Sequence, residues 1–444
     1  MSYDCSLFIF RRDLRLEDNT ALIRAMESSC KVVAAFILDP RQCQPHDYFS
    51  PKAFAFLRQS LDELSLAIER KGGRLYQFYG RSDEVIEDLL DHEKVDAVFI
   101  NKDYTPFSRQ RDGLIRKLCR QRGVAFEECD DVLLFPPGSV LKGAGGPYTV
   151  FTPFYKKSLT LTVAPVRRNE AVGFFLGELK SSFFLKASLL PKVDEVSVIA
   201  GGRAAGRANL SGVGIYKDYP RDRDIPAKDA TTHLSAHLKF GTVSVREAHA
   251  ALFKLGEGNM LLQQLYWRDF FTHIGFFFPH VFGNAFYDEY NYISWQNNKR
   301  LFAAWREGRT GFPLVDAGMR ELNATGFMHN RVRMVAASFL VKDLHIDWRW
   351  GEKYFAQRLV DYDPAVNNGN WQWAASTGCD HQPYFRVFNP ELQQKRFDPA
   401  FEYITKWVAE FNTQKYPAPV IYHPDAAAWS KEAFKAASRR TNRD

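Results

Sequence analysis

A short segment in the second half of the chain concentrates side chains that could do chemistry. Residues 361–373 read Asp-Tyr-Asp-Pro-Ala-Val-Asn-Asn-Gly-Asn-Trp-Gln-Trp, which supplies two carboxylates, three asparagines and two tryptophans. Ordering so many polar groups is costly unless they satisfy one another or a ligand. A helix cap and a turn could absorb Asp363 and the asparagines, and Trp371 could be a core residue. A binding site is the alternative interpretation.

A second segment supplies matching positive charge. Residues 330–334 read Asn-Arg-Val-Arg-Met, and their two arginines could pair with Asp361 and Asp363. A buried arginine and carboxylate beside an aromatic ring is the pair that an anionic flavin would need. The two segments are therefore candidates for one site.

The composition is typical of an ordinary globular protein. With 444 residues, 45% of them hydrophobic and 25% charged, the chain is too long for one core, so we expect two domains. The six cysteines form no C-x-x-C pair, which argues against a zinc ribbon or a redox dithiol. No apolar run could cross a bilayer, and early arginines argue against a secretory signal, so we expect a cytoplasmic protein without membrane contact. The net charge of +7 would favour DNA only if concentrated on one face.

Short apolar runs alternate with helical patterns in the first part of the chain. We expect buried strands at residues 7–10, 32–38, 75–79 and 95–100. This rhythm predicts a Rossmann-like α/β domain with a parallel sheet over residues 1–135. Ligands of such sheets lie beyond the carboxyl ends of the strands. No G-x-G-x-x-G follows the first strand, so an ordinary dinucleotide site is not supported.

The remainder divides into a connection and a helical domain. Glycine and proline clusters with weak patterning predict an inter-domain linker over residues 136–210. Helical patterns then dominate residues 211–444, with a capping box at 244–247 and a helix starting at Pro313. Seven of the nine tryptophans lie between Trp267 and Trp373, so the chemistry is expected in this domain.

Several separated motifs resemble the photolyase/cryptochrome family. They are the two segments above together with residues 10–15 (Phe-Arg-Arg-Asp-Leu-Arg), 267–270 (Trp-Arg-Asp-Phe), 307–311 (Glu-Gly-Arg-Thr-Gly) and 385–390 (Phe-Arg-Val-Phe-Asn-Pro). The similarity runs to about Trp407, and several motifs in the right order are more specific than any one. It implies an α/β antenna domain, an all-α C-terminal FAD-binding and DNA-binding domain, and light-driven DNA repair or light sensing.

The resemblance implies which residues hold FAD. The phosphates are expected at Tyr219, Thr231, Thr232, His233, Leu234, Ser235 and Arg268. The isoalloxazine ring is expected at the salt bridge of Arg333 with Asp361, near Asp363 and with Asn367 opposite the reactive ring nitrogen. Asparagine at that last position is typical of the family's repair enzymes, whereas plant and animal cryptochromes tend to have Asp or Cys. His233 and His237 lie four residues apart, but without a third ligand we expect no metal site.

The resemblance implies two different roles for tryptophans. Trp295, Trp348 and Trp371 match the chain that passes electrons from the surface to the flavin, although without family context they would be core residues. Trp267 and Trp373 match the pair that packs against a flipped-out pyrimidine dimer.

The neighbours of that pair bear on the lesion. Asn330 and Met334 match the cyclobutane-dimer enzymes, whereas (6-4) photolyases carry histidines at both positions. Gln264 stands where cyclobutane-dimer enzymes have Glu, and Gln is typical of the (6-4) and animal cryptochrome branch. An amide can still donate to a thymine carbonyl but cannot offer a carboxyl proton, so we expect repair at reduced efficiency.

DNA contacts and a second chromophore complete the expectations. We expect DNA to contact Trp267, Asn330, Arg331, Trp373, Arg386, Gln393, Lys395 and Arg396. The positively charged side chains among them would neutralise phosphates beside the lesion. An antenna site is expected at Arg11, Asp39, Asp103 and Phe107. The Glu that anchors a folate antenna is replaced at Ser108, so FMN, FAD or a deazaflavin fits better than folate.

The sequence therefore predicts a monomeric cyclobutane pyrimidine dimer photolyase that acts on UV-damaged DNA. By resemblance, reduced FAD excited by blue light, directly or through the antenna, gives an electron to the flipped dimer. A (6-4) photolyase, favoured by Gln264, and a signalling cryptochrome without repair activity remain alternatives. A flavin-free nucleic-acid-binding protein is a third.

Overall fold

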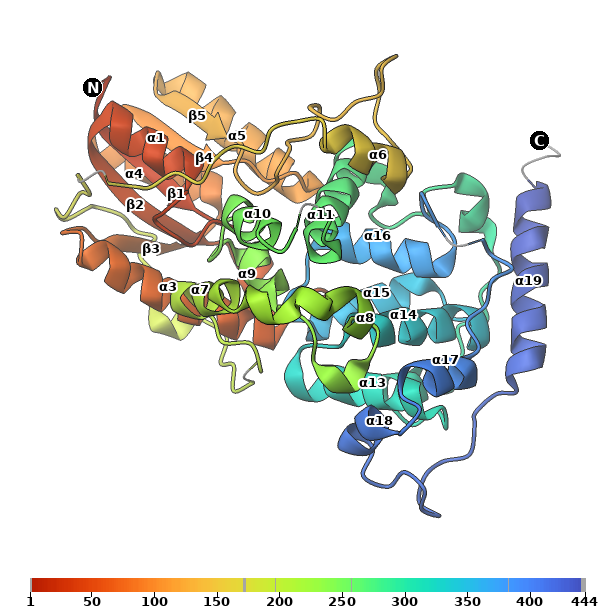
Figure 1. Cartoon of the computed structure of the whole chain (residues 1–444). Coiled ribbons are helices and arrows are strands. Elements are labelled where there is room, and N and C mark those ends of the chain that lie inside the picture. The colour runs from red at the N-terminus through yellow and green to blue at the C-terminus, as the bar shows by residue number, and fades with distance from the viewer. Residues whose placement is uncertain (1, 171–172, 196, 257, 382, 441–444) are drawn as a thin grey trace.

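The apolar runs of the first part of the chain form one parallel sheet. In the computed structural model, which describes residues 2–170, 173–195, 197–256, 258–381 and 383–440, five strands lie in the order β3-β2-β1-β4-β5 (Figure 1). They are β1 (Tyr3–Phe10), β2 (Ser29–Leu38), β3 (Leu75–Tyr79), β4 (Ala97–Asn101) and β5 (Ala125–Cys129). The predicted α/β class and four strands are confirmed. The sequence pattern misses β5, because this edge strand is only half-buried and carries two glutamates.

Helices cover both faces of the sheet. They are α1 (Thr20–Ser28), α2 (Pro40–Cys43), α3 (Pro51–Glu69), α4 (Ser82–His92) and α5 (Pro106–Arg122). Side chains of α1 and α3 pack with one face of the sheet, and those of α4 and α5 pack with the other. Asn19, Ser50 and Thr105 cap three of these helices by accepting hydrogen bonds from the first-turn amides.

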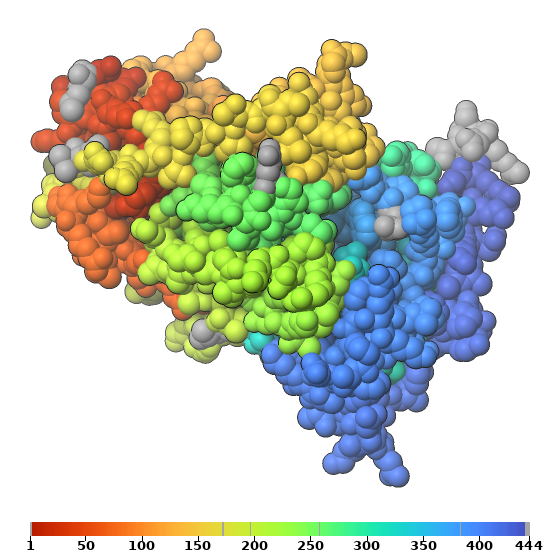
Figure 2. Space-filling view, viewed as in Figure 1, coloured from red at the N-terminus to blue at the C-terminus, as the bar shows by residue number. Residues whose placement is uncertain are grey.

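Residues 136–210 fold along both parts of the molecule. They contain α6 (Phe151–Ser158), η1 (Ala187–Leu189) and most of α7 (Arg203–Ser211). Phe174 and Phe184 form bridges to β2 and β3, so this stretch extends the edge of the sheet. In Figure 2 the yellow part of the segment lies over the first domain and the helical domain alike.

Beyond Ser211 the described residues contain helices and no strand. The elements are η2 (Val213–Asp218), α8 (Tyr219–Asp222), η3 (Pro226–Lys228), α9 (Leu234–Phe240), α10 (Val245–Phe253), α11 (Met260–Phe277), η4 (Pro279–Val281), η5 (Asp288–Tyr292), α12 (Lys299–Glu307), α13 (Pro313–Thr325), α14 (Asn330–Ser338), η6 (Phe339–Asp343), α15 (Trp348–Arg358), α16 (Pro364–Ala375), α17 (Pro390–Phe397), α18 (Glu402–Trp407) and α19 (His423–Arg440). The capping box at Ser244 and the helix start at Pro313 are confirmed. No helix in the described ranges is long and apolar enough to cross a membrane.

The loop after β1 joins the two domains. Arg15 is 2% exposed and donates to Asp131 of the first domain and to the carbonyl of Gly241 in the second. Arg246 of α10 binds the same Asp131 and also Asp18. Two arginines and two aspartates thus form a buried network at the junction, and it fixes the domains relative to each other.

Candidate functional site

Helices α14 and α16 bring the two chemically rich segments together. Arg333 on α14 forms a two-bond ion pair with Asp361, which lies just before α16, at N···O distances of 3.3 and 3.1 Å. Its Nε also donates to the carbonyl of Met328 at 2.7 Å. Arg331, the other arginine, instead pairs with Asp224 at 2.8 Å. One of the two arginines therefore makes the expected kind of pair with the 361–373 segment.

Asp363 starts α16. One of its carboxylate oxygens accepts from the amides of Ala365 and Val366, at 3.1 and 3.2 Å, and the other is bound by Arg12. Burial by itself would raise the pKa of Asp363, but Arg12 and neighbouring cations outweigh it and lower that pKa to about 2. The ionised cap orients the helix that carries Asn367, Trp371 and Trp373.

The side chain of Asn367 is backed by a buried acid. Its Nδ2 donates to the backbone carbonyl of Glu352 at 3.2 Å, and the Glu352 side chain is nearly buried. Burial raises the pKa of Glu352 to about 7. Nothing in the sequence spacing indicates this acid, because it lies on α15 and meets Asn367 only in the folded protein.

The predicted phosphate residues leave polar atoms without partners. In the described part of the chain, Oγ1 of Thr231 and Nδ1 of His233 are buried and make no hydrogen bond, while Nε2 of His233 contacts Asp229 at 2.8 Å. Nε2 of His329 is likewise buried and unpaired among the described residues. Tyr219 is buried, and the guanidinium group of Arg223 lies over its ring. Unpaired buried groups are costly, so a polar ligand such as FAD fits these side chains.

The remaining predicted phosphate residues differ in exposure. Leu234 is buried, Thr232 is half-buried and Ser235 is exposed. Arg268 lies at the domain junction, where it donates to the carbonyls of Val132 and Leu238 at 2.5 and 3.3 Å. Its phosphate contact stays a prediction.

The predicted lesion residues occupy three neighbouring helices. Trp267 on α11 is half-buried and stacks on Phe151 of α6, with ring centroids 3.6 Å apart. Trp373 is half-buried on α16, which packs against α11. Nε2 of Gln264 donates back to the carbonyl of Met260 at 3.2 Å, and on α14 Nδ2 of Asn330 lies 3.9 Å from the sulfur of Met334.

Two of the three predicted electron-transfer tryptophans are buried, and the third is half-buried. Trp348 and Trp371 are 1% and 2% exposed. Trp371 lies against Gly351, one turn after Trp348 on α15, at a point where any Cβ would collide with the indole. Trp295 is half-buried and meets Phe434 of α19 edge to face at 6.0 Å. Trp305, which the resemblance does not single out, also contacts Trp371 at 6.2 Å.

The predicted antenna residues lie at the carboxyl ends of the strands and are paired with charges. Arg11 binds Asp112 at 2.5 Å, Asp39 binds Arg41 at 2.5 Å, and Asp103 binds Arg12 at 3.2 Å. Phe107 lies under two guanidinium groups, those of Arg41 at 4.9 Å and Arg111 at 6.0 Å.

Some donors of the antenna region remain free. In the described ranges, Nε of Arg11 and Nη2 of Arg111 are buried without hydrogen-bond partners. These donors fit an anionic group, for which a flavin phosphate is suitable. The sequence does not single out Arg41 or Arg111, because their approach to Phe107 depends on how α2 and α5 pack.

The predicted DNA-contacting side chains differ in availability. Arg386, Lys395 and Arg396 are exposed, whereas Gln393 is half-buried. Arg331 is 16% exposed at its side chain and lies over Phe397 at 4.4 Å in addition to its pair with Asp224. A phosphate would have to compete with that pair.

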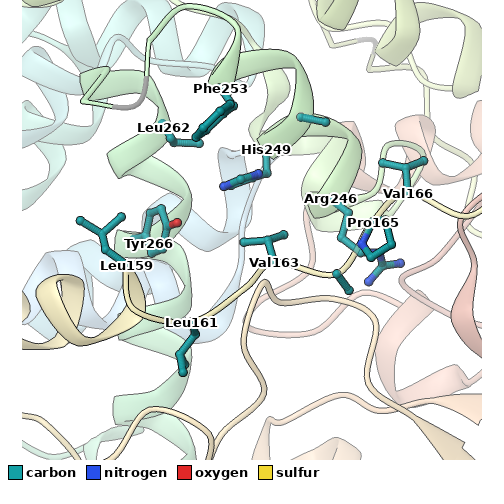
Figure 3. A pocket seen from close by; sticks show the side chains of 12 residues that line it. Leu159, Leu161, Val163, Pro165, Val166, Arg246, His249, Phe253, Leu262 and Tyr266 are labelled. Atoms are coloured by element: carbon teal, nitrogen blue, oxygen red, sulfur yellow. The ribbon is translucent and has the colours of Figure 1, made fainter.

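Two cavities are lined by none of the residues predicted to contact the FAD ring. One of about 760 Å³ at the domain junction is lined by Asp103 and Phe276 among others. The other, of about 340 Å³, lies between residues 159–166 and helices α10 and α11, with His249 and Tyr266 on its wall (Figure 3). None of the predicted site residues lines this second cavity. Within the described ranges, no group of three or more His, Cys, Asp or Glu side chains could hold a metal ion.

Two family models and a curated relative match this chain. The family model described as DNA photolyase matches residues 6–170, and that of the FAD binding domain of DNA photolyase matches residues 261–442. The deoxyribodipyrimidine photo-lyase of Vibrio cholerae is 37% identical over 472 residues, which cover 96% of this chain and 98% of that protein.

Two solved structures are similar over nearly the whole chain. The archaeal photolyase of Sulfolobus tokodaii with two FAD molecules has a TM-score of 0.88 and 43% identity, covering 98% of this chain and 100% of that one. A class III photolyase from Agrobacterium tumefaciens has a TM-score of 0.89 and 31% identity, covering 99% and 98%.

Proposed function

The chain belongs to the DNA photolyase family, and we propose that it is a deoxyribodipyrimidine photo-lyase that uses blue light to split cyclobutane pyrimidine dimers in DNA. The observation that carries the proposal is the pairing of Arg333 with Asp361 beside Asp363 and Asn367, in a chain similar over nearly its full length to enzymes of that name. A shared fold by itself does not determine which reaction a protein catalyses.

The two cofactors have separate places. FAD occupies the helical domain, held at its phosphates by the unpaired groups of Thr231 and His233 and at its ring by Arg333 and Asn367. When bound and reduced, FAD supplies the electron that opens the dimer under blue light. A second flavin serves as the antenna beside Phe107, as the relative with two FAD molecules suggests. On this division, residues 1–135 hold the antenna, 136–210 connect, and 211–444 hold FAD and bind DNA.

The protein side chains orient the lesion and admit electrons. Trp267 and Trp373 stack on the flipped bases, because indole faces hold extruded bases without sequence preference. Gln264 and Asn330 donate hydrogen bonds to them, and Met334 packs against them. Trp295, Trp348 and Trp371 carry electrons inward to FAD.

Surface charge and location follow from the same function. Arg386, Gln393, Lys395 and Arg396, with Arg331 if its pair with Asp224 opens, contact the phosphates beside the lesion. We place the enzyme in the cytoplasm with the DNA and expect it to act as a monomer.

The test follows thymine recovery in an oligonucleotide that carries one cyclobutane dimer, with reduced protein, in blue light and in darkness. Repair only in light is the expected result, and Gln264→Glu should raise the yield because a carboxyl group then faces the thymine. A (6-4) photoproduct is assayed in parallel. Repair of that lesion alone, or tight FAD binding with no repair of either lesion, would replace the proposal by a (6-4) enzyme or a photoreceptor.

A further inference from the structure

Arg12 crosses the domain junction and contacts both predicted flavin sites. It belongs to the loop that follows β1, and its two terminal nitrogens bind different carboxylates. Nη1 binds Asp103 of the antenna region at 3.2 Å, and Nη2 binds Asp363, the cap of α16. The side chains of Arg12, Asp103 and Asp363 are only 15%, 13% and 11% exposed.

Both carboxylates are also committed to their own domains. Asp103 accepts from its neighbour's amide, that of Tyr104, at 2.7 Å and from Oγ of Ser108 at 3.0 Å, which ties it to the start of α5. Asp363 uses its second oxygen to cap α16, the helix that carries Asn367. Arg12 is therefore shared between the start of one helix in each domain.

The backbone around Arg12 is fixed. Its Nε donates to the carbonyl of Lys239 at 3.2 Å, and the amide of Leu14 donates to the carbonyl of Phe240 at 3.1 Å. Gly241 has a φ of +67° and lies so close that any Cβ would collide with the carbonyl oxygen of Arg12. The guanidinium group can move toward one carboxylate or the other. The backbone of the loop cannot move with one domain alone, because it is hydrogen-bonded to the helical domain and continues from β1.

Other charges surround the two carboxylates that Arg12 binds. Asp363 also feels Lys239 and Arg268, and burial together with the charge of Arg12 lowers the pKa of Lys239 to about 8. Charges with little water between them interact more strongly than exposed ones. A change at Asp103 therefore alters how fully Asp363 is neutralised.

We propose that Arg12 is a positioning residue that couples the antenna site to the FAD site through the charge of Asp363. The proposal rests on the proposed function for the identity of the two ligands. Its consequence is that a change beside the antenna shifts the reduction of FAD in the other domain, and coupling of this kind is reciprocal.

The test measures the midpoint potential of FAD in the holoprotein, without DNA and without light. Arg12→Met removes the cation in direct contact with Asp363. Because reduction adds negative charge, the ratio of affinities for reduced over oxidised FAD should fall roughly tenfold, about 30 mV for two electrons. Asp103→Asn releases Arg12 to Asp363 and should shift the ratio the opposite way, by about threefold. In the double variant the shift due to Asp103→Asn should nearly vanish.

Arg203→Met is the matched control. Arg203 is also 15% exposed at its side chain and is held by Glu247 and the carbonyl of Thr242, but it contacts neither Asp103 nor Asp363. Its variant should lose stability and keep the potential. If Arg12→Met does not fold, the polar Arg12→Gln replaces it in both the single and the double variant.

Opposite shifts that interact in the double variant support the coupling. Shifts of the same sign, no shift, or a full effect of Asp103→Asn without Arg12 overturn it. The potential is independent of repair, so an inactive wild-type protein would refute the proposed function and leave this test standing. Hydrogen exchange at Ala365 and Val366 in the FAD-free protein gives a second readout, since Arg12→Met should speed it and Asp103→Asn should not.

Discussion

The two predicted flavin sites differ in how their polar groups are satisfied. In the helical domain, Thr231, His233 and His329 leave hydroxyl and imidazole atoms buried and unpaired among the described residues. At the predicted antenna site of the α/β domain, the carboxylates of Asp39 and Asp103 are each paired with an arginine. The buried atoms without a hydrogen-bond partner beside them, among the described residues, are guanidinium nitrogens of Arg11 and Arg111.

Because of this difference, the two sites are expected to select their ligands in different ways. A site with mixed donors and acceptors left open requires a ligand that matches several positions, which FAD can do along its length. A site that leaves only cationic donors selects for negative charge and tolerates variation elsewhere in the ligand. The FAD site is therefore expected to be the more sensitive to single substitutions.

The largest expected effect is at the ion pair of the helical domain. Arg333→Ala leaves the nearly buried Asp361 unpaired, which should cost about 2 to 4 kcal/mol of unfolding free energy, allowing for the partial exposure of Arg333, and should release FAD. Urea titration and the ratio of flavin to protein after gel filtration measure both. Arg320→Ala, which breaks a more exposed pair with Glu410, should cost about 1 kcal/mol or less and retain FAD. Equal flavin content in the two variants would contradict the comparison.

The pH dependence of stability should distinguish the buried acids of the two sites, because their pKa values shift in opposite directions. Burial raises the pKa of Glu352 to about 7, whereas the charges around Asp103 outweigh its burial and lower its pKa. Glu352 in the folded protein holds a proton that the unfolded chain releases near its ordinary pKa of 4.5. The stability it contributes is thus complete below about pH 4.5 and is lost as the pH rises to about 7, by about 2 to 3 kcal/mol.

The measurement compares urea midpoints of the wild type and Glu352→Gln across that window. The difference between them should change steadily with pH, and Glu391→Gln, at an exposed position of α17, should follow the wild type. Parallel curves for the wild type and Glu352→Gln would show that Glu352 is ionised in the folded protein.

A smaller effect is expected at the antenna. Arg41→Met removes one guanidinium beside Phe107 and should weaken binding of a second flavin about tenfold, or ~1.4 kcal/mol, without changing the FAD content of the helical domain. Fluorescence titration with FMN measures this affinity. Arg122→Met, at the far end of α5, is the control and should leave it unchanged. Loss of FAD in Arg41→Met would break the separation of the two sites.

The smallest expected effect is on DNA binding, which we expect to involve the helical domain alone. Lys395→Ala removes one exposed cation and should lower affinity for dimer-containing DNA a few-fold while reducing the salt dependence by about 0.9 in the log–log slope. Fluorescence anisotropy at several salt concentrations gives the slope. Lys31→Ala on β2 should change neither quantity, and an equal loss there would place DNA on the α/β domain too.

Local signals predicted much of this molecule. Apolar runs marked β1 to β4, and Ser244 and Pro313 marked helix starts, because these features act within a few residues of sequence. The edge strand β5 was missed, since half-buried residues give no apolar run. Residue types and spacing alone left open which of the two arginines in residues 330–334 would pair with Asp361. The family resemblance selected Arg333, and the structure has that pair, whereas Arg331 pairs with Asp224.

The sequence by itself determined the α/β and helical order of the chain, its family, and the segments 330–334 and 361–373 that carry the chemistry. Only the tertiary structure decided that Glu352 backs Asn367, that Arg41 and Arg111 flank Phe107, and that Arg12 joins Asp103 to Asp363. The reason is physical. Propensity, capping and hydrophobic pattern act locally along the chain, whereas ion pairs and unpaired buried groups depend on which side chains from distant segments are excluded from water together.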